Sequence, residues 1–330
     1  MLTETVAGRT YDYTHNVGRG SQSGMGFNWP NSMTFAPDGT VYITNRGSES
    51  ISNVGWNRTG VGQRISKVTI GEEWGQEEFL GEFSRYGDGD GQLIWPAGIA
   101  NNGKGEVFVT DEWLNRISVF DSEGNFLRMW GETGAGEGEF DGPSGILIDH
   151  NDDIYLSDTR NHRIQKVTKD GAHIGTFGEM GSDDGQMDSP WGIAADSEGY
   201  IYVSDHMNHR AQKLTADGSF VASFGSEGTG RGELGRPSGI AVDRDGDIYV
   251  CDWSNNRIQV FASDGRFITS LLGDAAELSY WAKMTVEANP DAVRRRREVK
   301  DLRVEWSLNM PTDLVFDPVE NRLIIADPQR

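Results

Sequence analysis

Short apolar runs recur along the whole chain, and polar turns separate them. In residues 239–251, for example, the runs GIAV and IYVC flank the turn DRDGD. Apolar runs of this length, bounded by glycine and aspartate, are typical of short β-strands joined by hairpin turns. Because the same arrangement returns from end to end, the pattern predicts an all-β protein.

The strand pattern repeats with a nearly constant period. Each unit opens on a proline, and from the second to the fifth unit these prolines are 47 residues apart. The six opening prolines are Pro30, Pro96, Pro143, Pro190, Pro237 and Pro311. A unit of this length holds four short strands, and a fixed period of that size indicates the blades of a β-propeller. We therefore predict a single domain, residues 1–330, with its blades arranged around a channel.

The sixth unit, residues 310–330, stops after two strands. A propeller ring has to close, because an open ring would expose the edge of a sheet. Gly18 precedes Pro30 by 12 residues, which is also the spacing between a closing glycine and the next proline in later units. We therefore expect residues 2–18 to supply the outer third and fourth strands of the sixth blade.

Two segments interrupt the period. Residues 48–64 are inserted between the second and third strands of the first blade, and residues 274–308 follow the fifth blade. Apolar positions at helical spacing in 278–288 predict a helix, and Pro290 is expected to begin a second one. Connections of both kinds open on the same face of a propeller, so we expect a partial lid over one end of the channel. Sealing of an irregular ring, or a dimer contact, is the alternative.

Charge and composition narrow the choice of partners. The 330-residue chain has a formal net charge of −21, and an acidic surface repels phosphate backbones, so we expect no nucleic-acid partner. The single cysteine, Cys251, excludes an intrachain disulfide. The sequence contains neither a membrane-length apolar run nor a signal peptide, so we expect a soluble, cytoplasmic protein with no membrane partner. Earlier removal of a signal peptide stays open.

Residues 236–267, RPSGIAVDRDGDIYVCDWSNNRIQVFASDGRF, closely resemble the consensus of the NHL-repeat family. The resemblance is strong over five units and partial over the sixth. It implies a six-bladed β-propeller of NHL repeats, here with a helical insertion after blade five and ring closure by the N-terminal strands. Within the repeated element D-x-x-N-x-R we expect the aspartate and the arginine to pair, as Asp158 and Arg163 would.

The loops after the second strands carry different side chains in every unit, although the surrounding residues repeat. These loops converge at the channel mouth, where an apolar wall with a few polar groups would suit a small molecule. We predict three catalytic residues: His206 as general acid or base, Arg160 as an anchor for an anion, and Glu112 as a base or metal ligand. The predicted substrate-binding residues are Trp113, Trp191, Trp253, Met207, Arg46 and Asn31. The structural alternative is inter-blade packing for the tryptophans and a surface position for the histidine.

Three branches of similar propellers give different expectations. Amidating lyases hold zinc with histidines just after the opening prolines, where this chain has Asn31, Ala97, Ser144, Trp191, Ser238 and Thr312. The chain thus resembles those lyases in fold without their zinc histidines. Calcium-dependent lactonase-type propellers hold an axial metal, which Asn31, Asn45 and Glu112 would imitate. The NHL domains of RNA-binding regulators carry a basic face, whereas this chain is acidic.

Two functions follow from the sequence. The first is a small-molecule site at the channel mouth, with an acid/base pocket if the chain is a lyase or a hydrolase. The second is a protein–protein interaction module that uses the same face. An axial calcium or zinc ion, a protein partner and a homo-oligomer all stay open, and the sequence does not identify the substrate.

Overall fold

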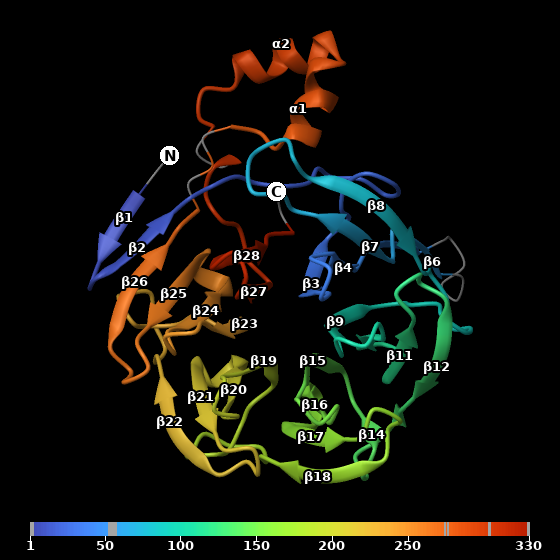
Figure 1. The fold of residues 1–330 in the computed structure, drawn as a ribbon, viewed down its shortest axis with the longest axis vertical. Coiled ribbons are helices and arrows are strands. Elements are labelled where there is room, and N and C mark those ends of the chain that lie inside the picture. The colour runs from blue at the N-terminus through green and yellow to red at the C-terminus, as the bar shows by residue number, and fades with distance from the viewer. Residues whose placement is uncertain (1–2, 52–57, 274, 276, 303–304, 329–330) are drawn as a thin grey trace.

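Five consecutive units fold into four-stranded antiparallel sheets, which stand around a common axis as blades (Figure 1). The structure is a computed structural model, and it describes residues 3–51, 58–273, 275, 277–302 and 305–328. From the inner strand outward, blade one consists of β3 (Pro30–Phe35), β4 (Val41–Asn45), β7 (Arg64–Thr69) and β8 (Glu78–Phe83). Blade two consists, in the same order, of β9 (Pro96–Asn101), β10 (Val107–Asp111), β11 (Arg116–Phe120) and β12 (Phe126–Trp130).

Blades three to five repeat this order. Blade three consists of β15 (Pro143–Ile148), β16 (Ile154–Asp158), β17 (Arg163–Val167) and β18 (His173–Phe177). Blade four consists of β19 (Pro190–Ala195), β20 (Ile201–Asp205), β21 (Arg210–Leu214) and β22 (Phe220–Phe224). Blade five consists of β23 (Pro237–Val242), β24 (Ile248–Asp252), β25 (Arg257–Phe261) and β26 (Phe267–Leu271). The smaller elements are β13 (Glu132–Thr133), β14 (Glu139–Phe140) and the 3-10 turns η1 (Thr159–Asn161), η2 (His206–Asn208) and η3 (Trp253–Asn255).

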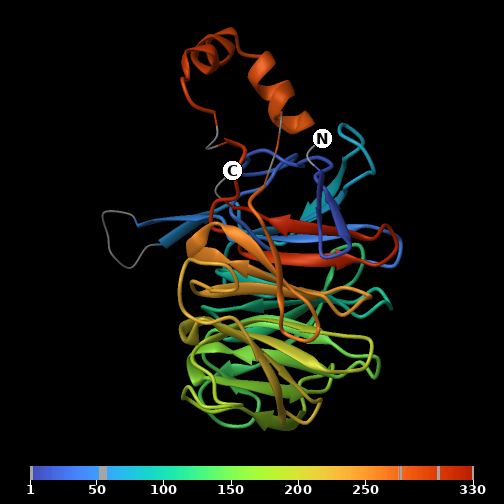
Figure 2. The same cartoon turned by 90° about the vertical axis from the view of Figure 1, so that its left-hand side faces the viewer.

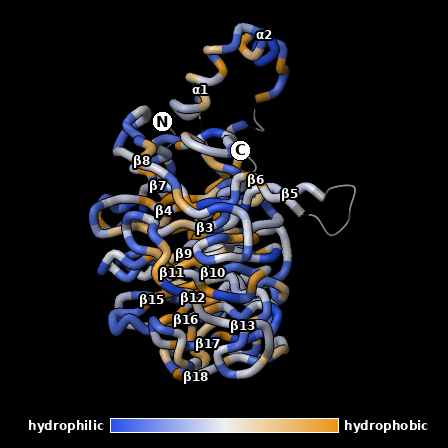
Figure 3. The backbone as a smooth tube through the Cα atoms, turned by 90° about the vertical axis from the view of Figure 1, so that its right-hand side faces the viewer, coloured by the Kyte–Doolittle hydropathy of each residue, from blue (hydrophilic) through white to orange (hydrophobic). Residues whose placement is uncertain are grey.

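Burial follows the position of each strand within its blade. Every residue of β10 and β24 is buried, because neighbouring blades pack on both faces of these second strands. The outer strand β8 alternates between exposed and half-buried residues, as expected for a strand with solvent on one side. In Figure 3 the hydrophobic segments accordingly lie within the stack of blades and the hydrophilic ones follow its outline.

The aspartate that ends each second strand braces the loop that follows. Asp158 accepts a hydrogen bond from Arg163 Nε at 2.7 Å, which confirms the pairing expected from the sequence. Blades four and five repeat this ion pair with Asp205 and Asp252, and all three carboxylates are buried. The role of these ion pairs in folding therefore explains why the spacing of the motif recurs in these three blades.

A two-stranded sheet occupies the sixth position of the ring. Its strands are β27 (Asp313–Asp317) and β28 (Arg322–Ala326), and β27 lies between the inner strands of blades five and one. The six inner strands thus surround the channel (Figure 1). The fold is an all-β propeller, with five full blades and a shorter sixth sheet in the described residues.

The N-terminal residues form a hairpin, β1 (Thr3–Val6) and β2 (Arg9–Asp12). In the described part of the chain these strands pair with each other, and no ladder joins them to β28. The hairpin packs on blade five, where Arg9 binds Asp247 and the Tyr11 ring lies 6.5 Å from the Tyr249 ring. The expected extension of the sixth sheet is therefore replaced, in residues 3–12, by side-chain packing beside it.

The insertion after blade five contains two helices, α1 (Tyr280–Glu287) and α2 (Pro290–Glu298). The Ser279 side chain caps the first helix, and Pro290 opens the second, as the sequence predicts. Trp281 is 2% exposed and packs with residues of blade one and with Ala326 of β28. Helix α1 therefore covers the side of the short sixth sheet that faces blade one.

The two insertions do not form the expected lid together. Figures 1 and 2 show α1 and α2 beyond the rim of the ring and not across the channel, because Trp281 anchors α1 at the rim. The other insertion forms the paired strands β5 (Ser48–Ile51) and β6 (Arg58–Val61), and residues 52–57 between them lie outside the described residues. Glu49 of β5 accepts a hydrogen bond from Trp95 Nε1 at 3.1 Å, so this pair of strands does reach the loops of the mouth.

Neither of the helices that the structure describes has the length and hydropathy that a membrane span requires.

Candidate functional site in the channel and its mouth

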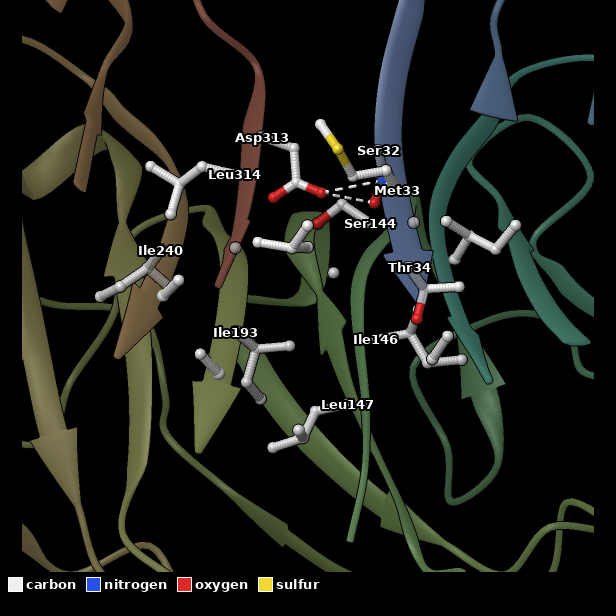
Figure 4. Close-up of a pocket in the computed structure, with 18 of the residues that line it drawn as sticks. Ser32, Met33, Thr34, Ser144, Ile146, Leu147, Ile193, Ile240, Asp313 and Leu314 are labelled. Carbon is white, nitrogen blue, oxygen red and sulfur yellow. Dashed lines mark hydrogen bonds between the residues drawn. The ribbon is translucent and has the colours of Figure 1, made fainter. Parts of the chain in front are cut away.

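A cavity of about 350 Å³ lies in the channel, and all six inner strands contribute to its wall. Figure 4 shows Ile146, Ile193, Ile240 and Leu314 around it, with the carboxyl group of Asp313 at one side. Asn31, Ser144 and Trp191 line it at positions directly after opening prolines, which is the end that faces the mouth. Most residues of the wall are therefore apolar, and its polar side chains other than Thr34 and Asn101 lie towards the mouth.

The third position of each repeat, counted from the opening proline, controls how closely neighbouring inner strands approach. Blades two to five have Gly98, Gly145, Gly192 and Gly239 there. A Cβ atom at any of the four would overlap the backbone of the next inner strand, so the packing requires glycine. The remaining two positions hold Ser32 and Asp313, on strands that adjoin each other where the ring closes.

Ser32 and Asp313 form a hydrogen-bonded pair at this seam (Figure 4). Ser32 Oγ donates to Asp313 Oδ2 at 2.6 Å, and the Met33 backbone N–H donates to the same oxygen at 3.3 Å. Burial raises the pKa of Asp313 to about 6, although both hydrogen bonds favour the ionised form and oppose this effect. At neutral pH the carboxyl group is therefore mostly ionised, within a largely apolar wall.

A second group of polar and aromatic residues joins blades one and two at the mouth. Arg46 donates to Glu112 Oε2 at 2.9 Å, and its guanidinium lies 5.0 Å from the centre of the Trp95 ring. The Trp113 ring meets Trp95 edge to face at 4.9 Å. Burial raises the pKa of Glu112, while the charges of Arg46 and Arg160 act in the opposite direction. This carboxylate is thus already neutralised by Arg46.

His206 forms an aromatic row with two of the predicted tryptophans. Its ring centre lies 5.2 Å from Trp191 and 6.2 Å from Trp253. The Pro237 carbonyl lies 3.0 Å from Nδ1, so Nδ1 is the protonated nitrogen. Burial lowers the pKa of His206, which leaves a neutral ring with an unprotonated Nε2. The structure therefore brings three predicted residues together, but on blades four and five.

The three predicted catalytic residues do not contact one another. Arg160 is exposed and pairs with Asp141 at 3.1 Å, and it reaches Glu112 by electrostatic interaction alone. Within the described chain, no hydrogen bond or ion pair joins His206 to either of them. Met207 is also exposed, whereas Asn31 is buried and donates to the Ala97 carbonyl at 3.0 Å. These contacts therefore do not form a single pocket that contains His206, Arg160 and Glu112.

The residues proposed for an axial metal have separate structural partners. The Asn45 amide donates to the Ile43 carbonyl and to Ser66 Oγ within its own blade. Asn31 bonds to Ala97 and Glu112 bonds to Arg46, so the three side chains do not converge as a ligand set. Over the described residues, no group of three His, Cys, Asp or Glu side chains has an arrangement suited to a metal ion.

Sequence reasoning missed Ser32, Asp313 and Trp95. A signal for the first two was present, because glycine occupies the same position of four other repeats. Their pairing also required knowing that β27 adjoins β3. Trp95 directly precedes an opening proline, and nothing in its local sequence indicates that Arg46, 49 residues earlier, packs on its ring.

Comparison with protein families supports the repeat assignment. The NHL repeat model matches residues 234–261, and a model described as a 6-bladed beta-propeller matches residues 99–175. The chain therefore contains an NHL repeat within a β-propeller fold. The matched residues include β10 to β12 of blade two, β15 to β17 of blade three and β23 to β25 of blade five.

Several known proteins resemble this chain, each over a different share of its length. Protein lin-41 of Caenorhabditis elegans is 44% identical over 45 residues, which are 14% of this chain and 4% of that protein. The virginiamycin B lyase of Staphylococcus aureus has 16% identity and a TM-score of 0.52, over 91% of this chain and 78% of its own. A gluconolactonase of Xanthomonas campestris has 17% identity and a TM-score of 0.57, over 92% and 84% of the two chains. At such identities the structural likeness shows the fold alone.

Proposed function

We propose that this NHL propeller binds a small organic molecule in the mouth-side part of its channel. The observation that carries the proposal is the cavity of about 350 Å³, whose wall includes Trp191 and the inner-strand isoleucines. Cavities of this size, with apolar walls and a few polar groups, are the usual form of small-molecule sites. Asn31 and Ser144 supply uncharged polar groups, and Asp313 supplies a charge.

His206 is the candidate general base of this proposed site. Its ring contacts Trp191, and Trp191 is one of the residues that line the cavity, which supports a role for the imidazole there. A neutral imidazole whose Nδ1–H is already bound to a carbonyl presents Nε2 as an acceptor, which is the state that a general base requires. The proposal therefore extends to a lyase or a hydrolase, the classes to which the names of the two structural neighbours point.

Exposed apolar side chains favour a second candidate function on the same face. Trp113 is 44% exposed and Met207 is 41% exposed, and each stands in a loop that follows a second strand. Exposed aromatic and methionine side chains are enriched at protein interfaces. The alternative is therefore a protein-binding face centred on these loops.

A thermal-shift screen of small amines, alcohols, carboxylates and lactones tests the first function. We expect at least one class to raise the melting temperature of the wild type, and Trp191→Ala to remove that rise. Val221→Ala, on the exposed outer strand β22 of the same blade, is the matched control and should keep it. The proposal is wrong if no compound binds, or if both variants behave alike.

A further inference from the structure

The channel cavity contains an unbalanced charge. Of the described residues that line it, Asp313 alone is ionisable, and the others are apolar or uncharged polar residues. Asp313 lies deep in the molecule, yet it is partly exposed because it faces the cavity. A carboxylate in such surroundings is costly unless a compensating positive charge is present.

The neighbours of Asp313 stabilise the carboxylate without neutralising it. Ser32 Oγ and the Met33 and Leu314 backbone N–H groups are neutral donors. Arg46, which stands at the mouth, is already paired with Glu112. The charge is therefore satisfied by hydrogen bonds but has no cationic partner among the residues of the cavity wall.

The cavity favours a monovalent organic cation over a metal ion. Calcium takes six to eight oxygen ligands and magnesium takes about six, whereas the wall offers one carboxylate, a few uncharged polar side chains such as Asn31 and Ser144, and otherwise apolar residues. Met33, Ile146, Ile193, Ile240 and Leu314 form the part of the wall that an apolar group would contact. A ligand with one positive nitrogen and an apolar chain matches both features.

We propose that the channel binds a primary alkylammonium ion, whose nitrogen donates to the carboxylate of Asp313 while its alkyl chain lies along the inner-strand isoleucines. This inference rests on the proposed function, because it takes the channel as the ligand site. The formal net charge of −21 acts in the same direction, since it attracts cations and repels anions at long range.

Three six-carbon probes separate charge from shape: hexylamine, 1-hexanol and hexanoate. Their affinities are measured by isothermal titration calorimetry at about pH 7.5, where Asp313 is ionised. We expect hexylamine to bind at least about tenfold more tightly than 1-hexanol, the change expected for one charge-assisted hydrogen bond. Hexanoate should bind most weakly of the three.

Asp313→Asn keeps the shape of the side chain and removes its charge. We expect it to lower hexylamine affinity at least about tenfold and to leave 1-hexanol affinity unchanged. Asp313→Gly, which installs the residue of blades two to five, should give the same loss, and it serves if the asparagine variant does not fold. Asp245→Asn removes an exposed charge in the turn between β23 and β24, and it should bind hexylamine as the wild type does.

The outcomes distinguish the two proposals. If 1-hexanol or hexanoate binds as tightly as hexylamine, or if Asp313→Asn retains hexylamine affinity, the ammonium inference is wrong and the channel remains a binding site. If none of the three probes binds, the ammonium inference is wrong, and the screen described above decides whether the channel binds any other class of molecule.

Discussion

Replacing Asp313 by asparagine should stabilise the protein at neutral pH. The pKa of Asp313 is about 6 in the folded chain, against 3.8 for an unperturbed group. Each pKa unit corresponds to about 1.4 kcal/mol, so ionisation of this carboxyl costs the folded state about 3 kcal/mol. Because the folded-state pKa is the higher one, the cost is absent below pH 3.8 and complete once the pH exceeds about 6.

The test compares urea unfolding of the wild type and of Asp313→Asn, followed by tryptophan fluorescence from about pH 4 to about pH 7.5. The free energy of unfolding of the variant minus that of the wild type should rise by about 3 kcal/mol over this range. Asparagine still offers an oxygen to Ser32 Oγ, so that hydrogen bond contributes little to the difference. Asp245→Asn is the control for charge. A difference that stays constant with pH, or falls, would refute the assigned shift and the reasoning about burial.

Three further predictions address the mouth and the ring closure. The His206 imidazole should titrate below pH 6.5 in a proton NMR titration, because burial disfavours its charged form; a value at or above 6.5 would contradict the aromatic packing. Trp281→Ala should lower the free energy of unfolding by about 3–5 kcal/mol, measured in urea, since it empties the contact between α1 and blade one. Deleting residues 1–17 should lower the melting temperature in a calorimetric scan, because the Arg9–Asp247 and Tyr11–Tyr249 contacts are lost; an unchanged temperature would show that the hairpin does not support the ring.

Features within one repeat were predictable from the sequence. Asp158 and Arg163 flank a single short loop, at the end of β16 and the start of β17, so the motif spacing alone determines that the two side chains meet. The start of α2 at Pro290 was predictable for the same reason, because helix capping depends on a few adjacent residues. Periodicity likewise placed the blades, since each strand packs against neighbours of the same kind.

Features that join distant parts of the chain were not predictable in the same way. The position of α1 depends on the packing of Trp281 against residues of blade one. The helical pattern of the sequence predicts an apolar face but does not identify the surface on which that face packs. Similarly, the spacing before Pro30 indicates two N-terminal strands but not whether they pair with β28 or with each other. The separation of His206 from Glu112 arises because blades two and four stand at different places around the ring (Figure 1).

The energetics of the seam favour a ligand-binding role for Asp313 over a structural one. In four blades glycine fills this position, and it does so without placing any charge in the channel. A carboxylate there costs about 3 kcal/mol at neutral pH, even with the hydrogen bond from Ser32 that favours its ionised form. A purely structural seam would therefore be more stable with the repeat residue. A cationic ligand would remove the penalty on binding, and so the charge that destabilises the empty propeller becomes a source of affinity and of selection against neutral molecules.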